Sequence, residues 1–218
     1  KVMALGAYGN SNSKYLKKIY QLFDLKKYGQ YELDLSFFTY YLFDKHKKSY
    51  NHKLIELLGP DRNKGDPILR CHKDIAAALQ KAFEIIVLHQ LNFLYKETKT
   101  TNLCIAGGAA MNSAFNGKII KKTKFESLYI PPFPDDTGVS IGAALYEYYN
   151  SSKNTKRFQI KHNYFGPNYS NSEIKKTLSS FKIKAKIYND IEKVVAKRIA
   201  EGKLIGWFQG KMEFGQRA

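Results

Sequence analysis

Two adjacent glycines between a short apolar run and a helix-compatible stretch could bind a phosphate group. Residues 103–105 are typical of a short buried strand, Gly107 and Gly108 form a tight turn, and residues 109–115 can start a helix. Backbone N–H groups at such a junction can point at a phosphate, and glycine lets the ligand approach closely. Asn112 lies one turn into this helix, where its amide could reach a ribose or a phosphate. A ligand-free turn and an exposed asparagine remain the alternative for these residues.

An acidic turn further along the chain offers oxygen ligands for a cation. Asp135 and Asp136 precede a glycine- and alanine-rich helical stretch at 138–144. Carboxylate oxygens at the end of a strand can hold Mg²⁺, Mn²⁺ or iron beside a bound phosphate. Asp136 is the stronger candidate for a metal ligand, with Asp135 as its solvated partner, so the glycine and acidic turns together predict a nucleotide and metal site. The alternative is that the aspartate only caps the following helix.

The last residues of the chain combine glycines with basic side chains. A strand at 204–208 is predicted to run into a glycine turn that carries Lys211 and Arg217. A cationic fork of this kind can clamp a phosphate or a carbamoyl-like oxygen. A hairpin with incidental basic residues fits the same pattern, so the residue types alone leave both interpretations open.

Alternating helices and strands are predicted to position these turns. A helix is expected from Lys14 to Leu25, a strand from Tyr31 to Leu35, and a long amphipathic helix from Asp74 to Lys96. The elements that follow are strand 103–106, helix 109–121, strand 127–130 and helix 138–149. This order indicates an α/β layer in which helices pack against a sheet.

The second half of the chain is predicted to cross a domain boundary. Residues 151–164 are expected to link a first domain, 1–150, to a second, 165–218. The second domain is expected to contain a helix at 173–181, a strand at 183–188, a helix at 191–200 and the strand at 204–208. We expect the chain to be a piece of a longer protein, with its second domain incomplete.

The charge and cysteine content limit the function classes. Lys and Arg number 36 against 19 Asp and Glu, which gives a net charge of +17. Only five of the 36 are arginine and the lysines are scattered, so a solvated lysine-rich surface is favoured over nucleic-acid binding. Cys71 and Cys104 provide no disulfide framework; Cys104 is expected to be a buried, inert thiol, and a cytoplasmic location is predicted. No apolar run reaches the roughly 20 residues of a membrane span.

Four segments, taken in order, resemble the O-carbamoyltransferases of the NodU/CmcH type, which include nodulation-factor and antibiotic carbamoyltransferases such as the tobramycin enzyme. They are KVMALGAYG at 1–9, GGAAMNS at 107–113, DDTGVSIGAA at 135–144 and GWFQGKMEFGQRA at 206–218. Each segment is modest evidence by itself. Their shared order covers nearly the whole chain, which makes the resemblance specific.

The resemblance implies a fold and a reaction. The fold is the later part of a Kae1-like domain of the actin/Hsp70/sugar-kinase superfamily, followed by the start of a YrdC-like α/β domain. The reaction uses carbamoyl phosphate and ATP to form a carbamoyl-adenylate in the YrdC-like part. The carbamoyl group then passes to a hydroxyl of a small acceptor in the Kae1-like part. The resemblance leaves a homodimer open and involves no membrane.

The resemblance also implies roles for individual residues. Gly107, Gly108 and Asn112 are expected along the nucleotide, and Asp136 is expected to ligate a divalent metal, iron or Mg²⁺. Arg217 is expected to hold carbamoyl phosphate or the adenylate. Residue types alone do not identify the acceptor.

The chain departs from the family pattern, and rival functions remain. Gly6-Ala7 stands where the family has Ala-Pro, Gln216 stands where it has proline, and no His-x-x-x-His pair is present to complete the metal site. We therefore expect the 218 residues to be inactive alone. A sugar kinase or a threonylcarbamoyl-tRNA synthesis protein would fit the glycine and aspartate motifs but not residues 207–217. A basic nucleic-acid-binding module would instead show strongly salt-dependent affinity.

Overall fold

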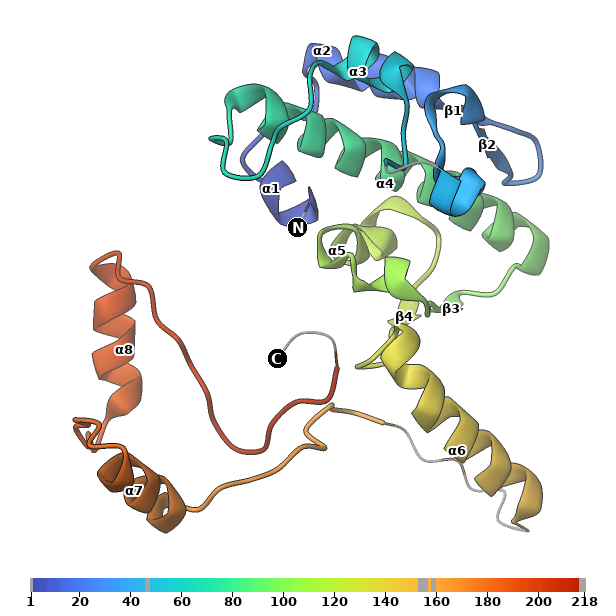
Figure 1. The fold of residues 1–218 in the computed structure, drawn as a ribbon. Coiled ribbons are helices and arrows are strands. Elements are labelled where there is room, and N and C mark those ends of the chain that lie inside the picture. Colours follow the sequence, from blue (N-terminus) through green and yellow to red (C-terminus); the bar gives the residue numbers. More distant parts are fainter. Residues whose placement is uncertain (1, 46–47, 153–156, 158–159, 216–218) are drawn as a thin grey trace. The chain divides into compact units, whose positions relative to one another are not determined.

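The computed structural model describes residues 2–45, 48–152, 157 and 160–215 (Figure 1). The chain divides into two compact units, Lys1–Ile130 and Pro131–Ala218, which we call unit 1 and unit 2 and describe separately. Of the linker predicted at 151–164, residues 153–156 and 158–159 lie outside the described part. The domain boundary predicted in this linker stays a prediction. The membership of the first domain in the actin-like superfamily also stays a prediction.

A 29-residue helix, α4 (Arg70–Thr98), is the longest element of unit 1 (Figure 1). It confirms the helix predicted at 74–96 and extends it at both ends. Lys99 ends the helix in the left-handed conformation, with φ of 54°. Neither α4 nor any other helix of the described residues is long and apolar enough to cross a membrane. The buried apolar residues of α4 are Ala76, Ala77, Ala78, Ala82 and Leu91.

The chain that precedes α4 folds back onto it. Helices α1 (Val2–Gly6) and α2 (Lys14–Ile19) both pack on α4, and α3 (His52–Leu58) packs on α2. Two 3₁₀ segments, η2 (Leu35–Phe37) and η3 (Tyr40–Lys45), precede α3. Small side chains on α4 let these helices approach closely. The buried residues of this core are Ile19, Leu22, Ala78 and Ala82.

The helix predicted at 14–25 is wrong in its second half. After α2 the chain makes one 3₁₀ turn, η1 (Tyr20–Leu22), and then enters strand β1 (Phe23–Leu25). Strand β1 pairs antiparallel with β2 (Tyr31–Leu33), which confirms most of the strand predicted at 31–35.

A histidine on α4 explains why this hairpin replaces the end of the predicted helix. His89 Nε2 lies 2.8 Å from the carbonyl oxygen of Lys26 and 3.1 Å from that of Gln30, so it anchors the turn between the strands. A contact between residues so far apart in the chain outweighs local helical periodicity.

The predicted strand–helix–strand order after α4 is confirmed. Strands β3 (Asn102–Cys104) and β4 (Ser127–Tyr129) pair in parallel, and the 3₁₀ turn η4 (Gly108–Met111) and helix α5 (Ser113–Lys122) connect them. The expectation that Cys104 is buried is wrong, because strand side chains alternate and only Leu103 of β3 faces the core. The buried residues beneath this sheet are Leu91, Leu103, Phe115, Ile119 and Phe125.

The regular secondary structure among the described residues of unit 2 is helical. The 3₁₀ turn η5 (Asp136–Gly138) leads into α6 (Val139–Ser151), which confirms the helix predicted at 138–149. Helices α7 (Asn171–Ser180) and α8 (Ile191–Ala200) confirm the other two predicted helices. A capping box starts α7, because Ser170 accepts from the Glu173 N–H while the Glu173 carboxylate accepts from the Ser170 N–H.

The strands predicted at 183–188 and 204–208 are wrong. The described residues form only two sheets, each of two strands, and neither sheet includes these segments. A strand needs a neighbour for its N–H and C=O groups, and these segments have no such neighbour in the described residues. Their apolar side chains stay exposed, with Ile187 at 79% and Leu204 at 101% of full exposure.

Candidate functional site

The glycine turn of unit 1 is open on its outer side. Gly107 has φ of 94°, a left-handed value that side chains disfavour, and its carbonyl accepts a hydrogen bond of 2.9 Å from Ala110 N–H. A Cβ at Gly107 or Gly108 would meet no atom within 4 Å. The turn therefore leaves space for a ligand, and local packing does not explain why both residues are glycine.

Asn112 lies at the N-cap of α5 rather than one turn inside the helix. Its Oδ1 accepts a hydrogen bond of 3.1 Å from Phe115 N–H. Its carboxamide also forms two reciprocal hydrogen bonds with Gln80 on α4, of 3.1 and 2.9 Å. Asn112 is thus half-buried and bonded on both sides, which rules out the simply exposed asparagine considered from sequence.

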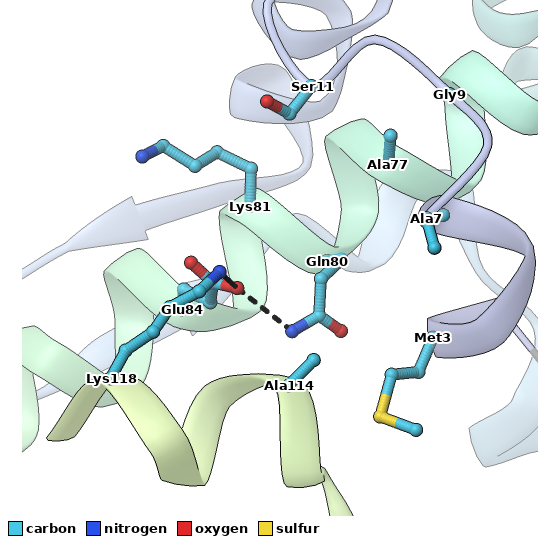
Figure 2. Close-up of a pocket in the computed structure, with 11 residues that line it drawn as sticks. Met3, Ala7, Gly9, Ser11, Ala77, Gln80, Lys81, Glu84, Ala114 and Lys118 are labelled. Carbon is cyan, nitrogen blue, oxygen red and sulfur yellow. Dashed lines mark hydrogen bonds and ion pairs between the residues drawn. The ribbon is translucent and has the colours of Figure 1, made fainter.

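A buried carboxylate continues this network. Glu84 is 7% exposed, and its Oε1 accepts from Gln80 Nε2 at 3.0 Å and from Lys118 Nζ at 2.5 Å. Figure 2 shows these side chains meeting between α4 and α5. Lys118 is about half exposed, so the ion pair joins a buried acid to a partly solvated base.

These side chains form one wall of a cavity of about 280 Å³ within unit 1 (Figure 2). Helix α1 and the segment after it close another wall. Two lysines and one carboxylate make the lining cationic, which suits an anionic or strongly polar ligand. The lining residues are Met3, Gly6, Ala7, Gly9, Ser11, Ala77, Gln80, Lys81, Glu84, Ala114 and Lys118.

Sequence reasoning missed Gln80, Glu84 and Lys118. A helical signal for Glu84 existed, because it lies seven residues from both Ala77 and Leu91 and therefore shares their buried face. No comparable signal existed for the contact between Gln80 and Asn112, which are 32 residues apart in the chain.

Breaking the Glu84–Lys118 pair from one side is expected to destabilise unit 1. Lys118→Met leaves a buried carboxylate without its cation, and we expect the free energy of unfolding to fall by about 2 kcal/mol, less than for a fully buried pair. Glu84→Gln combined with Lys118→Met removes the charge as well and should recover most of the loss. Urea denaturation measures both, and equal loss in the single and double variants would contradict this account.

The two aspartates of the acidic turn in unit 2 differ from the prediction in which side chain is solvated. Asp136 is exposed at the start of η5, whereas Asp135 is 7% exposed. Asp135 Oδ1 accepts from the Thr137 hydroxyl at 2.7 Å, and its Oδ2 is buried without a hydrogen-bond partner in the described residues. The expectation that Asp135 is the solvated partner is therefore wrong. Neither η5 nor α6 has a side-chain cap, so the capping alternative is not observed.

The turn fits a cation in part. An unpartnered carboxylate oxygen and a neighbouring exposed carboxylate are the hard oxygen donors that Mg²⁺ takes. The described residues contain no group of three or more His, Cys, Asp or Glu placed to share one ion. Asp135 and Asp136 can therefore supply part of a ligand set.

The basic segment near the end of the chain is held inside unit 2. Met212 N–H donates to the carbonyl of Pro167 at 2.9 Å, and Gly166 N–H donates to that of Met212 at 2.9 Å. The Phe133 ring, two residues before Asp135, contacts the Phe214 ring at 5.8 Å between centroids. Unit 2 thus brings the acidic turn and this segment together.

Not every predicted residue of the basic segment can be placed. Lys211 is exposed, and Arg217 lies outside the described residues, as does Gln216. The predicted convergence of the acidic turn with the glycine turn stays a prediction, because the turns belong to different units.

The parallel β3–α5–β4 unit, its open glycine turn and the adjoining polar cavity define unit 1 as a candidate ligand-binding α/β structure. Residues 1–145 match the family model described as Carbamoyltransferase N-terminus. The chain therefore belongs to the carbamoyltransferase family, which confirms the resemblance seen in the sequence.

Relatives in three bacteria extend this match. An uncharacterized protein of Synechocystis is 35% identical to the chain, and the match covers the whole chain and 36% of the relative's length. Nodulation protein NolO of Bradyrhizobium diazoefficiens is 33% identical, and its match covers the whole chain and 38% of its own length. Nodulation protein NolNO of Sinorhizobium fredii is 35% identical over 72% of the chain and 24% of its length. The chain thus spans less than two-fifths of these relatives.

Proposed function

We propose that this chain is part of an enzyme that moves a carbamoyl group from carbamoyl phosphate, through an ATP-derived carbamoyl-adenylate, to a hydroxyl of a small acceptor. The match of residues 1–145 to the carbamoyltransferase family carries the proposal. The same match favours carbamoyl transfer over a sugar kinase, a threonylcarbamoyl-tRNA synthesis protein or a nucleic-acid-binding module.

The geometry of unit 1 supports a nucleotide at the glycine turn. The open space at Gly107 and Gly108 lets phosphate oxygens approach backbone N–H groups. Gln80, which is hydrogen-bonded to Asn112, also lines the cationic cavity, and the lysines of this cavity suit the remaining charge of an adenylate. In this arrangement Asn112 positions the turn instead of reaching the ligand with a free amide.

The acidic turn of unit 2 is proposed to hold the divalent metal. Asp135 would offer its unpartnered buried oxygen and Asp136 its exposed carboxylate. Bound there, Mg²⁺ or iron would supply positive charge for a nucleotide phosphate. Arg217 would bind carbamoyl phosphate through a bidentate fork, which matches the geometry of an anionic oxygen pair.

The proposed transfer replaces one bond to the carbamoyl carbon by another. The acceptor hydroxyl oxygen attacks the carbamoyl carbon and forms the new bond. The bond between this carbon and the phosphate oxygen of AMP breaks, AMP leaves, and the hydroxyl proton passes to solvent. AMP is a good leaving group, which is why a weak nucleophile such as a hydroxyl suffices.

Adenylate formation tests the proposal directly. The intact protein is incubated with ATP and carbamoyl phosphate, and mass spectrometry of the quenched mixture is expected to show carbamoyl-adenylate only when both are present. ATP consumption that ignores carbamoyl phosphate would overturn the proposal.

A variant of Asp136 should distinguish the two half-reactions, adenylate formation and carbamoyl transfer. Asp136→Ala is expected to keep adenylate formation and to lose transfer of labelled carbamoyl to a panel of small hydroxylated acceptors, because the metal acts at the transfer step. Glu147→Gln, an exposed acid on α6, is the control and should keep both activities. Equal loss of both half-reactions in Asp136→Ala would contradict this division of sites.

A further inference from the structure

We propose that Gln80 is a positioning residue that fixes the glycine turn of unit 1 through Asn112. Gln80 lies in the middle of α4, and Asn112 directly follows η4 and caps α5. This inference rests on the proposed nucleotide-binding function of that turn. It assigns a role to a residue that has no place in the sequence motifs.

The hydrogen bonds around Gln80 allow only one orientation of its amide. Glu84 can only accept, so the Gln80 Nε2 group must face it at 3.0 Å, and Gln80 Oε1 is left to accept from Asn112 Nδ2 at 2.9 Å. Lys118 holds Glu84 in place from α5. The donor and acceptor pattern therefore runs without conflict from Lys118 to Asn112.

The other end of the network imposes the same orientation. Phe115 N–H can only donate, so Asn112 must present Oδ1 to it, and the same oxygen accepts from Gln80 Nε2 at 3.1 Å. The Asn112 amide group is then turned toward Gln80. Both carboxamides are thus locked from both ends, which is the condition for a satisfied polar network that rigidifies its surroundings.

The glycine turn has its own hydrogen bond from Ala110 N–H to the Gly107 carbonyl, and the lock supports the turn from α4 through Asn112. The ideal Cβ positions of Gly107 and Gly108 meet no atom within 4 Å, so no packing holds the outer side of the turn. Asn116 supports the inner side through a hydrogen bond of 2.7 Å from its Nδ2 to the Ala110 carbonyl. Removing the Gln80 amide should let the Asn112 side chain move. The backbone N–H groups of the glycine turn would then no longer all point toward the bound phosphate.

The test compares two glutamines of the same helix in the intact protein. Gln80→Met keeps length and removes the hydrogen bonds, and Gln90→Met is the control, because Gln90 is exposed and does not line this cavity. We expect Gln80→Met to raise the Kd for ATP, and the KM for ATP measured by transfer of labelled carbamoyl, by about tenfold, as one or two lost hydrogen bonds predict. The kcat should stay within about twofold, because an interaction made equally in the ground state and the transition state changes KM alone. Gln90→Met should leave all three values unchanged.

A double variant tests whether Gln80 acts on ATP binding through Asn112 or contributes only to the stability of the fold. Gln80→Met combined with Asn112→Ala is expected to bind ATP no more weakly than Asn112→Ala, because both changes break one network. A Gln80→Met protein with a lower melting temperature but an unchanged Kd for ATP would overturn the positioning role, and so would additive losses. If the wild-type protein binds no ATP, the proposed function fails first and this inference fails with it.

Discussion

Replacing Gly9 with alanine is expected to lower the free energy of unfolding of unit 1 by about 3 kcal/mol. An ideal Cβ at Gly9 would overlap the carbonyl oxygen of Lys73 and would lie 2.9 Å from Cβ of Ala77, both on α4. A helix carbonyl cannot move aside without weakening its own hydrogen bond. The segment after α1 would therefore have to move away from α4.

Two hydrogen bonds hold this segment where the clash occurs, and an ion pair within α4 supports them. Asn10 N–H donates to Asp74 Oδ1 at 2.7 Å, Arg70 Nε pairs with the same oxygen at 3.0 Å, and Arg70 Nη1 donates to the Tyr8 carbonyl at 3.4 Å. Moving the segment would strain these contacts. Gly9 also lines the cavity, so ATP binding should weaken in the same variant.

Gly117→Ala is the matched control for this prediction. Gly117 lies within α5, and an added Cβ would meet no atom within 4 Å, so alanine should stabilise that helix by roughly 0.5–1 kcal/mol. Urea denaturation of both variants measures the difference. If Gly9→Ala unfolds at the same urea concentration as Gly117→Ala, the close approach of Gly9 to α4 is not part of the folded protein.

Local patterns were sufficient for most helices and for the β3–α5–β4 unit. The helix predicted at 74–96 carries apolar side chains at helical spacing, and the capping signals at Ser170 and Glu173 mark the start of α7. These signals act within a few residues along the chain, so sequence reasoning can find them. Family membership also followed from short motifs with a fixed order.

Contacts between distant residues limited the prediction of the site. The Gln80–Asn112 pair, the anchoring of the β1–β2 turn by His89 and the burial of Asp135 all depend on parts of the chain that meet only after folding. The sequence predicts a strand at 183–188 from alternation and a strand at 204–208 from its apolar residues. Alternation describes a segment's faces, but a strand also needs a partner to accept its hydrogen bonds.

A divalent cation is expected to stabilise unit 2, and Asp135→Asn is expected to remove that effect. An ion that binds only the folded state, at about 100 times its Kd, raises the free energy of unfolding by about 2.7 kcal/mol. Asp135 Oδ2 is buried and lacks a hydrogen-bond partner in the described residues, so a cation would relieve an unfavourable buried charge. Asparagine at this position removes the charge and weakens the ligand.

Melting curves with MgCl₂, MnCl₂ or no added metal measure this effect in the intact protein. Asp135→Asn should melt at or above the wild-type temperature without metal, because it removes the unpaired charge, and it should gain nothing from either ion. Asp136→Asn should reduce the gain without changing the metal-free melting temperature, since Asp136 is exposed. The exposed control Glu147→Gln should keep the full gain. An Asp135→Asn protein that keeps the full gain would place the cation elsewhere and leave the buried oxygen to a different partner.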